Sequence, residues 1–262
     1  NPSSIELVLN DVIDNNQDSD EWILNMGNIF YSYKCHSSIY SNDEKELVKK
    51  IRKIKQSAHQ SLIVCDYLFI TLGSAFVYEH KDLNATVTNC HKQSSSLFEK
   101  RLLSVEEIVF NYRLLIQKLR VFNPRISIII TVSPVKYLKD GLVENNISKS
   151  TLLLAANTLE NDGLVDYFPA YELVNDDLRD YRFYKEDMAH PNEQAIKYVW
   201  DKFNGTFFGE DTLTLNKEIE KLNAALNHKI LFPESEEAMA FQMNTEKMKR
   251  DLMKRHPYLK FF

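Results

Sequence analysis

The sequence predicts an α/β fold in which a parallel sheet is flanked by helices. Three short runs carry this prediction, at residues 66–72, 126–132 and 165–168. Each is nearly continuous in apolar residues, as expected of strands buried on both faces. Helical patterns separate the runs, and strands that alternate with helices form parallel β-α-β units. The sequence therefore predicts a three-layer α/β domain.

Helical periodicity accounts for most of the remaining chain. Ser104-Val-Glu-Glu107 has the pattern of a capping box, with a helix after it. Two segments are less regular: residues 22–41 are aromatic and irregular, and residues 76–100 resemble a hairpin or long loop. The predicted helices and their capping residues are 4–14 (Ser3 or Ser4), 43–62 (Asn42 or Asp43), 104–122 (Ser104) and 148–159 (Ser148 or Ser150).

The C-terminal part of the chain is helical and charged. Helices are expected over 193–203, 211–227 and 235–255, and the paired charges of the last two are typical of solvated helix faces. We expect one α/β domain over residues 1–205 and a helical extension over 206–262 packed on it.

Composition narrows the classes of function. A net charge of −5 and an isoelectric point near 5.9 give no electrostatic reason to expect a nucleic-acid partner. No glycine-rich phosphate loop is present, and the three cysteines lack the spacing of a zinc site or disulfide framework. No apolar run approaches the ~20 residues that span a bilayer. We expect a cytoplasmic protein with no metal and no cofactor.

The strand order implies where a site would form. In open parallel sheets, ligands bind outside the carboxyl ends of the strands. Three segments should meet there: Gly73–Phe76, Ser133–Val135 and the loop before His190. These segments place several polar side chains at one rim of the sheet.

Asp187-Met-Ala-His190-Pro191 is the strongest chemical signal in the chain. An aspartate three residues before a histidine can orient the imidazole and stabilise its protonated form, while the other ring nitrogen takes a proton from a nucleophile. The alternative is a helix-entry loop in which Asp187 accepts backbone N–H groups and His190 is merely exposed. The position of the motif after three strands favours the catalytic interpretation.

Gly73 and Ser74 follow the first predicted strand of the sheet. A tight turn there can aim backbone N–H groups and a hydroxyl at a developing oxyanion. An ordinary strand-to-loop turn is the alternative. Ser74 is a weak candidate nucleophile, because its surroundings do not match the G-x-S-x-G elbow.

Asn89-Cys90-His91 is a second cluster of functional side chains. We expect Asn89 and His91 to contact substrate. A thiol nucleophile at Cys90 is disfavoured, because adjacent residues in extended chain seldom point at each other and a cysteine enzyme needs a histidine adjacent in space. Arg179 and Arg182 either bind a substrate carboxylate or hold the loop through buried ion pairs, and the second role is slightly favoured.

Several ordered segments together resemble the GSCFA family, a bacterial group within the SGNH (GDSL-like) hydrolase superfamily. The resemblance spans nearly the whole chain and implies a flavodoxin-like sheet. The matching segments are Phe69–Glu79, Asn89–Lys92, Ile130–Val135, Lys139–Gly141, Ser148–Ser150, Tyr167–Glu172, Leu178–Tyr184 and Asp187–Pro191.

The resemblance implies an ester hydrolase or acyltransferase that acts on a small-molecule or glycan ester. It makes His190 the general base and Asp187 its orienting acid. Gly73-Ser74-Ala75 takes the place of the superfamily's G-x-N-D block, so Ala75 stands where an oxyanion-binding asparagine is usual, and Asn89 is a candidate replacement. A non-catalytic binding module that uses the same cleft is the alternative function.

The sequence departs from the family in one respect. The family's Gly-Ser-Cys-Phe-Ala motif, whose serine corresponds to the superfamily nucleophile, does not occur here. We therefore expect the nucleophile upstream of Asn1 and the chain to be an N-terminally truncated, inactive fragment. A sheet without its first strand should have fewer strands than usual and leave the His190 side of the site open.

Overall fold

The computed structural model describes residues 1–15 and 22–260, which form two compact units, residues 1–199 and 200–262. The long helices of the first unit are α1 (Pro2–Asp14), α2 (Glu44–Val64), α3 (Val105–Phe122) and α4 (Leu142–Asn161), and short turns follow at α5 (Ala170–Glu172), η3 (Leu173–Leu178) and η4 (Tyr181–Phe183). Its strands are β1 (Ile23–Met26), β2 (Ile29–Ser32), β3 (Tyr67–Leu72), β4 (Phe76–His80), β5 (Ala85–Val87), β6 (Phe98–Leu102), β7 (Ser127–Val132) and β8 (Asp166–Phe168).

The first unit contains the predicted parallel sheet, in the order β3-β7-β8. Leu72 pairs with Val132 and Thr131 pairs with Phe168, so the strands run parallel and end close together. These are the three strands expected from the apolar runs. The α/β class, with a parallel sheet flanked by helices and a helical C-terminal region, is confirmed.

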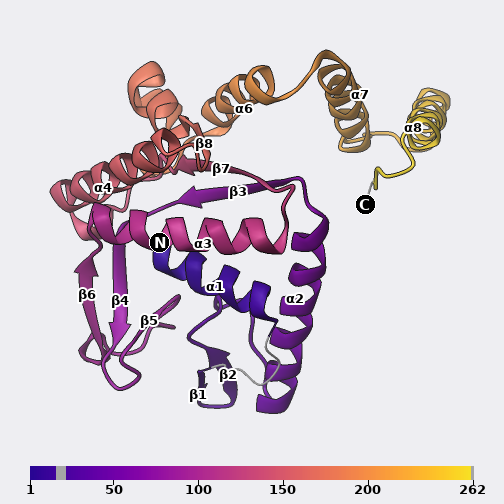
Figure 1. Ribbon diagram of the computed structural model, residues 1–262. Coiled ribbons are helices and arrows are strands. Elements are labelled where there is room, and N and C mark those ends of the chain that lie inside the picture. The colour runs from indigo at the N-terminus through magenta and orange to yellow at the C-terminus, as the bar shows by residue number, and fades with distance from the viewer. Residues whose placement is uncertain (16–21, 261–262) are drawn as a thin grey trace. The chain divides into compact units, whose positions relative to one another are not determined.

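A layer of helices covers one face of this sheet. Contacts join α1 to α3 and α3 to α4, and Figure 1 shows α1 and α3 side by side next to β3. Leu119, Ile130 and Ala155 are fully buried where helices and sheet meet. Removal of this apolar surface from water is the main stabilising contribution to the unit.

Strand β3 has one covered face and one open face. Leu68, Ile70 and Leu72 point into the core, whereas Tyr67 and Phe69 are 60% and 53% exposed. We predicted a strand buried on both faces, and that prediction is wrong for β3. Among the described residues β3 pairs only with β7, so its other edge has no hydrogen-bonded neighbour.

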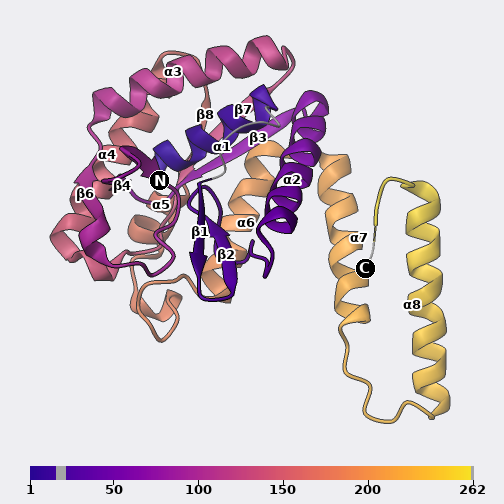
Figure 2. The same ribbon diagram turned by 90° about the horizontal axis from the view of Figure 1, so that it is seen from below.

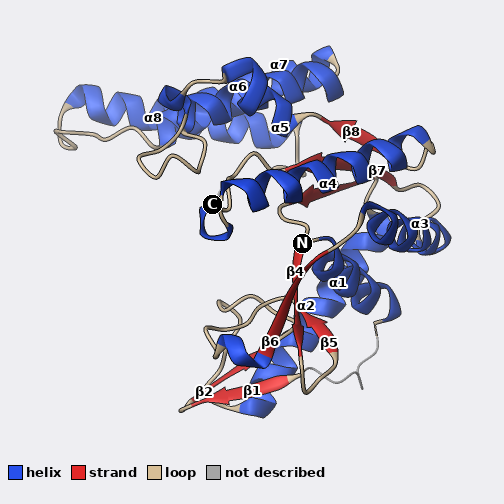
Figure 3. Ribbon diagram, turned by 90° about the vertical axis from the view of Figure 1, so that its left-hand side faces the viewer, coloured by secondary structure: helices blue, strands red, loops and turns tan. Residues whose placement is uncertain are grey.

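Antiparallel strands form a separate part of the first unit, as Figure 3 shows. Strand β4 pairs with both β5 and β6, which confirms a hairpin within residues 76–100. Strands β1 and β2 form a second hairpin that the irregular pattern of residues 22–41 did not predict; it lies near α2 in Figure 2.

Two helix starts differ from the prediction. Helix α1 is capped by Asn1, whose Oδ1 accepts the Ser4 N–H at 2.8 Å, rather than by Ser3 or Ser4. Helix α4 begins at Leu142, so Ser148 and Ser150 lie inside it. Gly141, at φ 98°, marks the true entry, because this backbone conformation favours glycine.

The C-terminal helices lie where the charge and hydrophobic patterns predicted them. Helix α6 (Glu193–Phe207) runs across the division between the units, and α7 (Glu210–Leu226) and α8 (Glu236–Arg255) belong to the second unit. An ion pair between Glu218 and Arg255 joins α7 to α8. In the described part of the chain, no helix is both long and apolar enough to cross a membrane.

The open face of β3 predicts unequal effects of two strand substitutions. Ile130→Ala should lower the free energy of unfolding by about 2–5 kcal/mol, because it leaves a cavity in the core. Phe69→Thr keeps a strand-forming residue and should lower it by less than about 1 kcal/mol. Urea denaturation measures both values. Equal losses would show that the Tyr67–Phe69 face is covered in solution.

Candidate functional site

The loop Asp187–His190 is held by its own aspartate. Asp187 Oδ1 accepts the backbone N–H groups of Ala189 and His190, both at 2.9 Å. Asp187 Oδ2 lies 2.6 Å from His190 Nδ1. Met188 adopts φ 55°, which closes this tight loop. One carboxylate therefore orders the loop and orients the imidazole ring.

The charge of Asp187 fixes the roles of the two imidazole nitrogens. The backbone N–H groups of His190 and Ala189, followed by the His190 side chain, lower the pKa of Asp187 to about 2. An ionised carboxylate can only accept, so His190 Nδ1 donates and Nε2 of the neutral ring carries the free lone pair. The His190 side chain is 56% exposed. This arrangement suits a general base.

Neighbouring segments fix the His190 loop to the domain. Ala189 is buried, and its carbonyl accepts the Lys136 N–H at 3.2 Å. On the other side, Asn192 Oδ1 accepts the N–H groups of Gln194 and Ala195 at 3.1 Å and so caps α6. The loop is held between the segment after β7 and the start of a helix.

Gly73 and Ser74 form the turn at the carboxyl end of β3. Ser74 is buried, and its Oγ accepts the Phe76 N–H at 3.1 Å and lies 3.3 Å from Ser148 Oγ. A Cβ at position 73 would stand 2.6 Å from the Tyr137 hydroxyl, so glycine permits this close approach. The Ser74 hydroxyl therefore has partners other than His190.

Lys149 joins the ends of the two central strands. Its side chain is almost completely buried, and its Nζ donates to the carbonyls of Gly73 at 2.5 Å and Ser133 at 2.7 Å. Burial lowers its pKa to about 8. Lys149 is not among the site residues that we predicted from the sequence. The usable signal was the spacing of Asn145, Ser148 and Lys149, which puts three polar residues on one face of a helix.

These contacts bring together the three segments expected at the rim. Lys149 connects the Gly73 turn to Ser133, and the Lys136–Ala189 hydrogen bond connects the segment after Ser133 to the His190 loop. Because parallel strands end at the same edge of a sheet, the connections lie at one rim. His190 and Gly73–Ser74 thus belong to one neighbourhood.

Asn89 and His91 contact a different part of the chain. Asn89 Nδ2 donates to Ser37 Oγ at 3.1 Å, and His91 ring nitrogens lie 2.7 Å from the Ser32 carbonyl and 3.2 Å from Ser37 Oγ. His91 is 5% exposed. Among the described residues, neither side chain forms a hydrogen bond with His190 or Gly73. Asn89 instead lines a hollow of about 440 Å³ beside Phe69 on β3.

Cys90, Arg179 and Arg182 are the other candidate residues from the sequence, and the structure shows the surroundings of each. Burial raises the pKa of the Cys90 thiol, and the ring nitrogens of neighbouring His91 are engaged elsewhere, so nothing here activates a thiolate. Arg179 and Arg182 pair with Asp176 and Asp180 at 3.6 Å, but the arginine side chains are 77% and 72% exposed. The expected buried ion pairs are therefore wrong, because this stretch is a surface turn.

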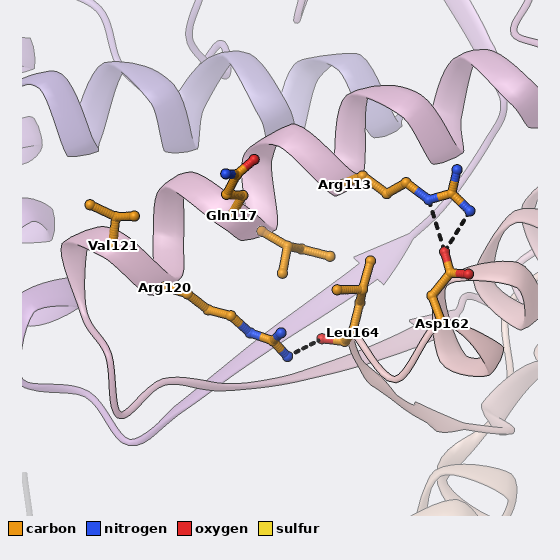
Figure 4. A pocket seen from close by; sticks show the side chains of 7 residues that line it. Arg113, Gln117, Arg120, Val121, Asp162 and Leu164 are labelled. Carbon is orange, nitrogen blue, oxygen red and sulfur yellow. Dashed lines mark hydrogen bonds and ion pairs between the residues drawn. The ribbon is translucent and has the colours of Figure 1, made fainter.

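A hollow of about 680 Å³ lies at the opposite edge of the sheet (Figure 4). Its lining comes from the end of α3 and the turn before β8, where Arg113 pairs with Asp162 and Arg120 donates to the Leu164 carbonyl at 2.9 Å. These segments precede strands β7 and β8, so the hollow is separate from the rim that carries His190. Across the described residues, no group of three His, Cys, Asp or Glu side chains is placed to hold a metal ion.

Fold and rim together define a parallel α/β domain with an oriented histidine at the carboxyl edge of its sheet. The chain belongs to the GSCFA family, whose model matches residues 1–203. A second model, the GSCFA domain protein C-terminal domain, matches residues 219–262. No curated protein and no solved structure matches the chain.

Burial of Lys149 predicts a dependence of stability on pH. The pKa is about 8 in the folded chain against an ordinary 10.5, so between these values the unfolded chain binds more protons. The free energy of unfolding should therefore rise with pH, by about 2–3 kcal/mol between pH 7 and 10 relative to Lys149→Met.

Chemical denaturation of both proteins at several pH values measures this difference, and the subtraction removes the titration of groups that do not interact with Lys149. A difference that stays constant with pH would show that Lys149 is ordinary in the folded state. Lys118→Met, which removes a half-buried lysine paired with Asp14, is the control. A rise of the same size relative to Lys118→Met would show that loss of any lysine has this effect.

Proposed function

We propose that the protein is a serine esterase or acyltransferase of the SGNH type, with Asp187 and His190 as its activating dyad. The observation that carries the proposal is the orientation of His190. Its Nδ1 donates to an ionised aspartate at 2.6 Å, and Nε2 of this exposed side chain is left as an acceptor at the strand-end rim. This is the state that a general base requires.

The chemistry follows from these roles. His190 Nε2 takes the proton of a serine hydroxyl as the serine oxygen bonds to the ester carbonyl carbon. The carbonyl oxygen becomes negative, and backbone N–H groups of the Gly73–Ser74 turn stabilise it. The imidazolium then returns the proton to the departing alkoxide, which leaves an acyl-serine. Water or a sugar hydroxyl attacks this ester and regenerates the enzyme.

The nucleophile is proposed to lie on a segment upstream of Asn1. Among the described residues, no Ser, Thr or Cys side chain forms a hydrogen bond with His190 Nε2. The family's Gly-Ser-Cys-Phe-Ala motif is absent from the sequence. The unpaired edge of β3 supports this placement, because a parallel strand added there would end level with Gly73 and deliver its next residues to the same rim.

A ligand-binding module is the second candidate function. It is favoured by the same lack of a side-chain nucleophile beside His190 in the described part of the chain. In that case the rim would hold an acylated or glycan ligand without cleaving it. Reactivity toward a covalent probe separates the two functions, since only the enzyme forms an acyl-serine.

Fluorophosphonate labelling tests the proposal. A polypeptide extended upstream to include the Gly-Ser-Cys-Phe-Ala segment should react at that serine, and the 262-residue chain alone should not. Intact mass and peptide mapping give the site. Labelling of Ser74 in the 262-residue chain would overturn the assignment of the nucleophile, and no labelling of the extended polypeptide would favour the binding module.

Asp187→Asn should slow this labelling by about 10³-fold or more, because a carboxamide can donate to Nδ1 and so hold the wrong tautomer. The rate constant of labelling in the extended polypeptide measures the effect. Asp176→Asn is the matched control, since it neutralises an exposed aspartate in the preceding turn. An unchanged rate in Asp187→Asn would exclude the dyad.

A further inference from the structure

Helix α4 presents three polar residues to the ends of the parallel strands. Asn145, Ser148 and Lys149 are spaced i, i+3 and i+4, which places them on one helix face. Their exposed fractions are 6%, 2% and 1%. Buried polar side chains are retained only where partners satisfy them, so the contacts of this face indicate what it does.

The contacts of this face are with the two segments that leave the sheet. Asn145 Oδ1 accepts the Tyr137 N–H at 2.9 Å, and Ser148 Oγ accepts the Ala75 N–H at 2.8 Å. Lys149 Nζ donates to the Gly73 and Ser133 carbonyls. The helix therefore holds the turn after β3 and the segment after β7 at the same time.

The Lys149 contact sets the direction of one backbone donor. In a planar trans peptide the C=O and N–H point in opposite directions, and the chain has no cis peptide bond among its described residues. Because Lys149 holds the Gly73 C=O, the Ser74 N–H points away from Lys149. That N–H has no hydrogen-bond acceptor in the described part of the chain. The equivalent peptide after Ser133 offers no donor, since residue 134 is proline.

Lys149 also leaves an uncompensated positive charge under the rim. Among the described residues it forms no ion pair with a carboxylate; its Nζ contacts two carbonyls and lies 5.2 Å from the centroid of the Tyr137 ring. A buried cation without a counter-ion is unfavourable, and it favours negative charge nearby. Negative charge develops at an ester carbonyl oxygen during acyl transfer, so the location of this cation matches the proposed chemistry.

We propose that Lys149 is a positioning residue that aims the Ser74 N–H at the acyl oxyanion. The oxyanion role of the Ser74 N–H rests on the proposed function. The coupling of Lys149 to Ser74 rests only on the hydrogen bonds of Lys149. If Lys149 only fills the core, its replacement changes stability without a specific effect at Ser74.

Backbone ¹⁵N NMR of the 262-residue chain tests the coupling. The Ser74 amide shift should titrate with a midpoint near pH 8 in the native sequence, as Lys149 deprotonates. The titration should vanish in Lys149→Met. The Asn1 amino group and the Tyr137 phenol also lie near Lys149, so a titration that persists in Lys149→Met belongs to one of them and overturns the inference.

Leu152→Ala is the matched control. Leu152 is three residues further along α4 and fully buried in the core, so its truncation destabilises the same helix without touching the turn. The Ser74 titration should remain in Leu152→Ala. Its loss there would show that any damage to α4 has the same effect, which also overturns the inference. Lys149→Gln, which keeps N–H donors without a titrating charge, replaces Lys149→Met if that variant does not fold.

The proposed role of Lys149 in oxyanion stabilisation is tested by kinetics of the extended polypeptide. Lys149→Met should lower kcat for an activated acyl ester by about 10²-fold, the effect of a lost oxyanion donor, with KM nearly unchanged. Unchanged kcat would overturn the oxyanion role. The NMR titration needs no nucleophile, so it decides the coupling of Lys149 to Ser74 even if the extended polypeptide fails to react with a fluorophosphonate.

Discussion

Parallel pairing of β7 with both neighbours is the constraint on which the rest of the first unit depends. It aligns the ends of β3, β7 and β8 at one edge of the sheet. Every segment that leaves this edge is therefore brought to the same neighbourhood, whatever its distance in sequence. The Gly73 turn, the Ser133–Tyr137 segment and the His190 loop are separated by about fifty residues or more at each step, yet two hydrogen-bonding groups, Lys149 Nζ and the Lys136 N–H, connect them.

Polar side chains lie at this edge of the sheet because strand ends leave backbone groups that need hydrogen-bond partners. At the Gly73 and Ser133 carbonyls those partners come from Lys149 on α4 and not from the next strand. The single Lys149 ammonium group donates to both carbonyls. The group that binds these carbonyls is consequently charged, and it contacts the turn that contains the Ser74 N–H.

Much of the fold was predictable because its signals are local. Continuous apolar runs located β3, β7 and β8, and Asp43 and Ser104 cap α2 and α3 as expected. Features that depend on tertiary contacts were not predictable. The exposure of Phe69 depends on what covers the sheet, and Ser148 caps nothing because α4 starts at Leu142. The spacing of Asp187 and His190 predicted their pairing. The position of Asn89 and His91 beside Ser37 depends on tertiary contacts, which no short motif predicts.

Two histidines illustrate why geometry is needed to separate structural from functional side chains. His91 is buried, with Nε2 at the Ser32 carbonyl and Nδ1 at Ser37 Oγ, and burial is the largest of the effects that lower its pKa. Both nitrogens are occupied, so a proton has no route to it from a substrate. His190 has one nitrogen bound to an ionised aspartate and the other directed to no described partner. Only the second arrangement combines a fixed tautomer with an accessible lone pair, and this combination lets a general base accept a proton.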